Sequence, residues 1–231
     1  MKKRHLFLLL TLPLLAFLAS CKGDAGTTGT TGTTGPSGAP GLITMSFQDG
    51  VYPSNSYAGT TANNMISDLL ANTAYYGDTF VTIGSSSSYK YHVLLKFDLT
   101  SAVVPTGVTV KYAYLTITMF STMTNTINVY PVTVPWISTQ TSWNNNAIAS
   151  TWTTAGGDYG ALMDSKDTNA ITLTFSLSPA LVTSWISSPS TNYGVLLKAT
   201  DELSNIYVNI FTGLFSIPAD RPRLTIYYSL P

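Results

Sequence analysis

Apolar and polar side chains alternate with a period of two over most of the chain after the first 42 residues. In the run 109–120, Ala113 and Leu115 lie on one side of an extended chain. Tyr112 and Tyr114 lie on the other side, as in a half-buried β-strand. Similar runs, separated by clusters of Gly, Ser, Asn and Pro, occur at 79–84, 91–99, 126–132, 171–177, 193–199, 205–211 and 223–229. Because no helices alternate with these runs, they predict an all-β fold, an antiparallel β-sandwich of jelly-roll type.

One short helix is predicted after the run 171–177. Ser178 can cap its N-terminus, and Pro179 suits the first helical position. An apolar stripe then follows on one helical face, formed by Leu181, Val182, Trp185 and Ile186. Pro189 is expected to end the helix. The stretch 65–70 has similar spacing, and the sequence leaves it open between helix and strand.

Residues 1–20 have the pattern of a bacterial lipoprotein signal peptide. Three basic residues at 2–4 precede an apolar run at 6–18, which is too short for a membrane-spanning helix of about 20 residues. The sequence Leu-Ala-Ser-Cys at 18–21 matches the lipobox, so Cys21 is predicted to be the lipidated first residue of the mature chain. We expect a protein anchored by lipid in the cell envelope, facing the periplasm or the cell exterior. The alternative is an ordinary secretory leader.

Glycine recurs at every third position from Gly23 to Gly41, which gives six consecutive Gly-X-Y triplets. This is the collagen pattern, because only glycine fits at the axis where three chains meet. A triple helix would span roughly 55 Å at about 3.1 Å per residue and would make the protein a homotrimer. The alternative is a flexible Gly/Thr spacer. Residues 21–42 are therefore predicted to be a stalk or linker, and residues 43–231 a single folded domain.

Charge and cysteine content narrow the function classes. The sequence has 11 basic and 11 acidic residues, and three of the basic ones lie in the leader, so the mature chain has 8 against 11, a net charge of −3. This argues against nucleic acid as a partner, because nucleic-acid-binding proteins carry a strong basic excess. Cys21 is the only cysteine, so no intrachain disulfide can form. An apolar core has to hold the domain together.

Five segments, taken in order, cover nearly the whole domain: 93–101, 105–117, 128–145, 181–199 and 221–228. Together they resemble the DNRLRE domain family of secreted and surface proteins, which overlaps carbohydrate-binding module family 96. The resemblance implies a β-sandwich accessory module, often attached to polysaccharide-degrading enzymes or cell-surface proteins, with glycan binding in part of the family. After the first tryptophan of the third segment, the family usually has an acidic residue. This chain has Ser138 there, and so lacks a carboxylate for calcium or a ligand.

The sequence offers few candidate catalytic residues. His92 is the only histidine outside the leader, so a histidine metal site or a catalytic triad would rest on it alone. It is expected to face solvent from its strand. Asp158, Asp164 and Asp167 lie close together in sequence and suit a turn cluster, or at best a structural calcium site, better than a glycosidase carboxylate pair. We expect a protein that is not an enzyme and needs no cofactor.

Binding residues are better represented. Sugars stack their C–H faces on aromatic rings, and their hydroxyls or carboxylates accept hydrogen bonds from basic and amide groups. Tyr112 and Tyr114 lie side by side on the outward side of their strand. By the same parity, His92, Lys96 and Asp98 are expected to face outward from theirs. If the two strands are neighbours, these residues form an aromatic and basic platform for an acidic or neutral polysaccharide. Otherwise the tyrosines are exposed on an outer sheet face without a binding function.

The four tryptophans divide into two pairs. Trp185 lies on the apolar stripe of the predicted helix, and Trp143 lies in the family-like segment, so both are expected in the core. Trp136 and Trp152 flank a long loop and could reach a ligand.

The sequence therefore favours a cell-surface, non-catalytic module that binds a glycan or another cell-surface polymer and contacts the membrane through its lipid anchor. The alternative is a structural or adhesive surface protein. In that function the collagen-like stalk joins three sandwiches, whose outer faces contact one another.

Overall fold

The computed structural model describes residues 41–231, apart from 101–103 and 106. In chain order, the strands are β1 (Ile43–Phe47), β2 (Thr60–Ser67), β3 (Phe80–Ser86), β4 (Tyr89–Phe97), β5 (Thr109–Thr118), β6 (Thr126–Pro131), β7 (Asn145–Ala147), β8 (Ser150–Thr151), β9 (Asp164–Asp167), β10 (Thr172–Leu177), β11 (Val195–Ala199), β12 (Tyr207–Phe211) and β13 (Arg223–Ser229). The helical elements are α1 (Pro179–Ser187) and three single 3₁₀ turns, η1 (Asp68–Leu70), η2 (Pro189–Thr191) and η3 (Pro218–Asp220).

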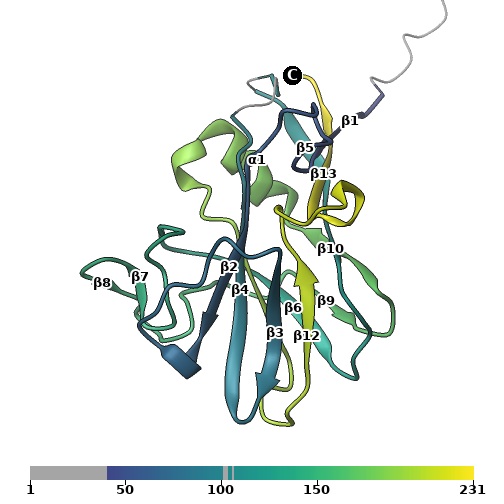
Figure 1. The fold of residues 1–231 in the computed structure, drawn as a ribbon. Coiled ribbons are helices and arrows are strands. Elements are labelled where there is room, and N and C mark those ends of the chain that lie inside the picture. Colours follow the sequence, from purple (N-terminus) through teal and green to yellow (C-terminus); the bar gives the residue numbers. More distant parts are fainter. Residues whose placement is uncertain (1–40, 101–103, 106) are drawn as a thin grey trace, which may run out of the picture. The chain divides into compact units, whose positions relative to one another are not determined.

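The strands form two large antiparallel sheets and one small hairpin (Figure 1). The four-stranded sheet has the order β1-β13-β5-β10. The seven-stranded sheet has the order β12-β3-β4-β11-β6-β9, and β2 also pairs with β4. Strands β7 and β8 pair only with each other. These sheets, with one α-helix among the described residues, confirm the predicted all-β sandwich.

The main core lies between the inner faces of the two sheets. Each sheet contributes alternate residues of its strands, as the period of two predicts. Fully buried side chains of the four-stranded sheet include Leu115, Ile117, Phe175, Leu224 and Ile226. Those of the seven-stranded sheet include Ile83, Val93, Leu95, Val129, Leu197 and Ile210. This apolar layer holds the domain together without a disulfide.

The helix forms as the sequence predicts. Ser178 Oγ accepts a hydrogen bond from the Leu181 backbone N–H (3.4 Å), and Val182 and Trp185 are buried in the main core. The stretch left open at 65–70 is a strand end followed by a turn. β2 runs to Ser67, whose hydroxyl accepts a hydrogen bond from the Leu69 N–H (3.2 Å) and starts η1.

A second, smaller core lies on the other face of β4 and β11. The segment 132–160 folds back over this face, and its side chains pack with residues of β2, β4 and β11. The buried members of this core are Ile66, Leu94, Val132, Trp136, Trp152 and Leu196. Consecutive residues Val93, Leu94 and Leu95 are therefore all buried, because this part of the sheet is covered on both faces.

Truncation of Trp185 to alanine tests the main core. The Trp185 side chain of α1 is buried in the main core, so Trp185→Ala is expected to lower the free energy of unfolding by about 3–5 kcal/mol. Ile148 is 77% exposed, so Ile148→Ala should change it by no more than about 0.5 kcal/mol. Denaturant unfolding of both variants measures the difference, and equal midpoints would contradict the burial of Trp185.

Candidate functional site

The structure separates the residues of the predicted platform. Tyr112 and Tyr114 lie on β5, which pairs with β13 and β10 in the four-stranded sheet. His92 and Lys96 lie on β4, which pairs with β2, β3 and β11 in the seven-stranded sheet. The platform required β4 and β5 to be neighbours, and they belong to different sheets. The prediction of a single aromatic and basic face was therefore wrong.

The two tyrosines join a third one on the outer face of the four-stranded sheet. Tyr227 of β13 lies directly opposite Tyr112 in the register, and its ring centroid is 6.4 Å from that of Tyr112 and 6.0 Å from that of Tyr114. Both ring pairs have the edge-to-face geometry that aromatic side chains prefer. Tyr112 is 53% exposed, while Tyr114 and Tyr227 are half-buried. We call Tyr112, Tyr114 and Tyr227 the tyrosine face.

Hydroxyl groups surround the tyrosine face. The Ser46 and Thr225 hydroxyls are 3.0 Å apart across β1 and β13, and those of Thr116 and Thr174 are 3.1 Å apart across β5 and β10. Such pairs hold the side chains in register and leave further hydroxyl lone pairs for a ligand. The surface is thus a sheet face of rings and hydroxyls.

Charge on this surface has one sign. The four strands contain no Asp or Glu, and their two charged residues are Lys111 and Arg223. A β-bulge opposite Tyr227 and Tyr228 leaves Lys111 unpaired in the ladder, so Lys111 and Tyr112 are both exposed. The buried Nε of Arg223 has no hydrogen-bond partner among the described residues. Asp164, at the β10 edge, is already engaged by the Ser176 N–H (2.7 Å) and Lys166 (3.0 Å).

His92 is buried, contrary to the prediction that it faces solvent. Only 4% of its surface is exposed, because the segment 132–160 covers this face of β4. Nδ1 lies 2.7 Å from the Gly156 carbonyl oxygen, and Nε2 lies 2.6 Å from Glu202 Oε1. The Trp143 ring packs 4.8 Å from the imidazole. His92 therefore links β4 to two loops and is not available to a ligand.

His92 faces two hydrogen-bond acceptors, the Gly156 carbonyl and the Glu202 carboxylate. Burial opposes ionisation of Glu202, but the hydrogen bonds and charges of His92 and Lys198 outweigh it and lower the pKa of Glu202. Lys198 Nζ lies 3.1 Å from Glu202 Oε2. Burial opposes the charge of Lys198 as well, but Glu202 raises its pKa.

Gly156 makes this contact sterically feasible. Its φ is +93°, a region that L side chains rarely adopt. A Cβ at this position would lie 2.9 Å from the Trp143 ring and 3.2 Å from His92 Cε1. Only glycine therefore lets the backbone carbonyl approach the imidazole so closely.

Trp136 and Trp152 are structural, contrary to the prediction that they could reach a ligand. Both are buried in the second core. Their indole N–H groups donate to backbone carbonyls, Trp136 to Tyr193 (2.8 Å) and Trp152 to Ser142 (2.9 Å). Trp185 is buried as predicted, while Trp143 is only half-buried, beside His92.

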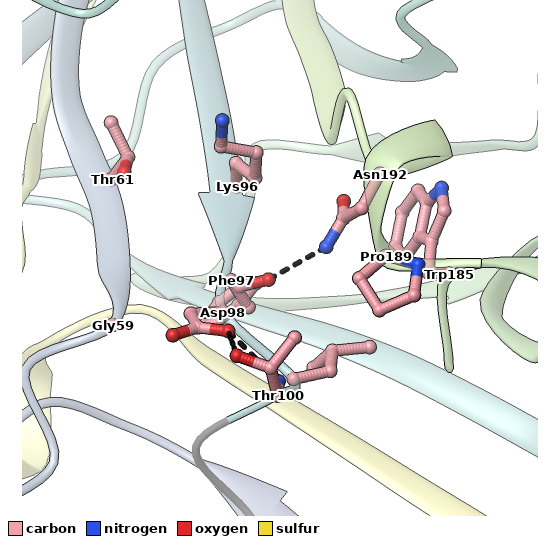
Figure 2. Close-up of a pocket in the computed structure, with 10 residues that line it drawn as sticks. Gly59, Thr61, Lys96, Phe97, Asp98, Thr100, Trp185, Pro189 and Asn192 are labelled. Carbon is pink, nitrogen blue, oxygen red and sulfur yellow. Dashed lines mark hydrogen bonds between the residues drawn. The ribbon is translucent and has the colours of Figure 1, made fainter. Parts of the chain in front are cut away.

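Lys96 lies at the rim of the second core, beside a pocket of about 260 Å³ (Figure 2). Its Nζ lies 5.1 Å from the centroid of the Trp136 ring, in cation–π geometry. Burial lowers the pKa of the Lys96 ammonium, and the charge of Asp98 offsets part of this effect. Lys96 lines this pocket, whereas His92, Trp136 and Trp152 do not.

The aspartates that suited a turn cluster, or at best a structural calcium site, make separate local hydrogen bonds. Asp158 accepts from the Thr153 and Thr154 N–H groups (2.8 Å each), and Asp167 accepts from the Thr126 hydroxyl (2.7 Å). Within the described part of the chain, no three His, Cys, Asp or Glu residues are grouped to hold a metal ion. Ser138 donates to Asn64 Oδ1 (2.6 Å) and accepts, through its carbonyl, from Asn64 Nδ2 (2.6 Å).

Cys21, the leader and the Gly-X-Y segment lie outside the described residues. In residues 41–231, where described, no helix is long and apolar enough to cross a membrane.

The lowered pKa of Glu202 predicts how the free energy of unfolding depends on pH. Because its pKa in the folded state lies below the ordinary value of 4.5, its charge stabilises the fold above about pH 4.5. This contribution is lost as the pH falls through the lower, folded-state pKa. Glu202→Gln should therefore cost about 1–3 kcal/mol at pH 7, and the difference from the parent protein should shrink towards pH 3. Denaturant unfolding of both proteins between pH 7 and pH 3 measures this difference. A difference that stays constant over this range would contradict the lowered pKa of Glu202.

Comparison with known proteins adds no family assignment. The sequence matches no protein-family model and no curated protein. The resemblance to the DNRLRE domain family therefore stays a prediction from the sequence.

Proposed function

We propose that the protein is a non-catalytic module that binds polysaccharide through the tyrosine face. The observation that carries this proposal is the group of three contacting tyrosines on a sheet face that is rich in hydroxyls and free of acidic residues. Exposed aromatic rings of this kind offer π-faces to the C–H faces of sugars.

The arrangement suits a polymer better than a small molecule. The rings and hydroxyls are spread over β1, β13, β5 and β10 and not gathered in a cleft, so successive sugars can lie along the sheet. Lys111 and Arg223 can donate to sugar hydroxyls or carboxylates. The face therefore suits neutral and acidic polysaccharides alike, and the missing carboxylates remove the repulsion that an acidic chain would otherwise meet.

The N-terminal sequence supports presentation at the cell surface. A lipid on Cys21 would hold the protein in the envelope, and the Gly-X-Y segment would separate the domain from the membrane. The resemblance to a family of accessory modules is consistent with the same function. The engagement of both His92 nitrogens supports a module without catalysis, because no free general base remains on that histidine.

Self-association is the second candidate function, and an aromatic cluster with two exposed members, Phe80 and Phe120, favours it. The ring centroids of Phe80 and Phe120 are 5.9 Å apart, those of Phe120 and Phe211 are 4.7 Å apart, and those of Phe211 and Phe215 are 3.8 Å apart. Phe120 is 56% exposed. Contiguous exposed apolar side chains often mark protein interfaces. A triple-helical stalk would join three copies of the domain.

Truncation of the tyrosines tests the proposed function. Tyr112→Ala and Tyr227→Ala are each expected to weaken retention by about five- to thirtyfold, because each removes one stacking ring. Affinity electrophoresis of the full chain in gels containing xylan, β-glucan or polygalacturonate measures the retention. Tyr207→Ala is the matched control, since Tyr207 is 51% exposed but lies on β12 in the other sheet. Equal retention of all three variants and the parent would exclude the tyrosine face.

Sedimentation of the full chain tests self-association. If the phenylalanine cluster and the stalk act together, the protein sediments as a trimer, and Phe120→Ser weakens that trimer because it removes an apolar contact. Leu203→Ser is the control, because Leu203 is 81% exposed and is not part of the cluster. A monomeric parent protein would eliminate this function.

A further inference from the structure

The pocket beside Lys96 is a second polar site that the tyrosine face does not use. It lies where β4 ends, between the start of β2 and the turn η2 that follows α1 (Figure 2). Its volume of about 260 Å³ is below the range of about 300–1,000 Å³ that is typical of pockets for drug-sized ligands. The pocket therefore suits one small ring and not an extended chain.

Lys96 brings uncommitted donors to this pocket. Among the described residues, its Nζ donates no hydrogen bond, and no carboxylate lies within 4.0 Å of it. The Trp136 ring, 5.1 Å away, favours the positive charge but satisfies none of its three N–H groups fully. A half-buried ammonium in this state can donate to an oxygen ligand, and hydrogen bonds from a charged donor are stronger than those between neutral groups.

The other polar groups of the pocket are held in place by the protein. Asp98 Oδ1 accepts from the Thr100 N–H (2.8 Å) and the Thr100 hydroxyl (2.6 Å). Asn192 Nδ2 donates to the Phe97 carbonyl (2.8 Å), and Asn192 Oδ1 accepts from the Gly194 N–H (3.2 Å). Figure 2 shows the first three of these bonds at the pocket wall. Fixed side chains of this kind lose little entropy when a ligand binds.

The mixture of groups defines the ligand class. Lys96 is a donor, Asp98 is an acceptor of opposite charge, and Trp185 and Pro189 contribute apolar wall. An anionic ligand would meet the Asp98 carboxylate, and a cationic one would meet the Lys96 ammonium. Hydroxyl groups both donate and accept, and a pyranose ring also presents an apolar C–H face. We propose that this pocket binds a single neutral sugar residue, free or at the end of a glycan.

This inference deepens the proposed glycan binding but shares no residue with the tyrosine face, so the two can fail separately. If both proposals hold, the module binds the length of a polymer on the tyrosine face and a terminal sugar residue in the pocket beside Lys96. If only the pocket binds, the protein recognises small sugars and not polymers.

Saturation-transfer difference NMR of the full chain tests the pocket. The probes are D-glucose, D-galactose, D-mannose and N-acetyl-D-glucosamine, with D-glucuronate as the acidic comparison. At least one neutral sugar should bind. Lys96→Met should lower the affinity for that sugar at least tenfold, because the variant loses the charged donor but keeps the apolar stem over Trp136. Lys90→Met on the same strand is the control and should bind like the parent.

Thr61→Val provides a second variant if Lys96→Met does not fold. The substitution keeps the shape of a pocket-lining side chain and removes its hydroxyl. It should lower the affinity for the same sugar severalfold. Three outcomes would overturn the proposal: no neutral sugar binds the parent protein, D-glucuronate binds more tightly than every neutral sugar, or the folded pocket variants bind as the parent does.

Discussion

Burial of the seven-stranded sheet on both faces determines which surfaces of this domain are free for function. The inner face packs on the four-stranded sheet, and the segment 132–160 covers β4 and β11 on the outer face. With no disulfide available, these two apolar layers carry the stability of the domain. The outer face of the four-stranded sheet is not covered in this way, and its rings and hydroxyls are exposed or half-buried.

The covering segment is held by polar contacts as well as by its tryptophans. His92 reaches from β4 to the Gly156 carbonyl in the segment and to Glu202 in the loop after β11. Glu202 in turn contacts Lys198. The Glu202 carboxylate and the Lys198 ammonium are partners of opposite sign, which is how a buried ion pair avoids an uncompensated desolvation cost. A histidine that could have been a functional group is therefore part of the scaffold.

The two proposed binding surfaces differ because their surroundings differ. The tyrosine face is an open sheet surface without carboxylates, which suits contact with a long ligand of neutral or acidic character. The pocket beside Lys96 is lined by the start of β2, the end of β4 and the turn after α1, and its wall holds a half-buried cation and the hydrogen-bonded side chains of Asp98 and Asn192. A pocket of this kind would discriminate between ligands by their shape and hydrogen bonding. The open face would discriminate between them by ring stacking and charge.

Sequence alternation by itself determined the properties that are local to one strand or helix. It established the β-sandwich, the helix after Ser178 and the outward direction of Tyr112 and Tyr114, because side-chain direction follows from backbone geometry. The same parity in β13 could also have found Tyr227. Only the tertiary structure decided which strands are neighbours and which outward faces are covered. Pairing of β5 with β13 joined the tyrosines and separated them from Lys96. Packing of the segment 132–160 on the sheet buried His92 together with the segment's own Trp136 and Trp152. These outcomes depend on contacts between residues far apart in the chain, which a period of two cannot encode.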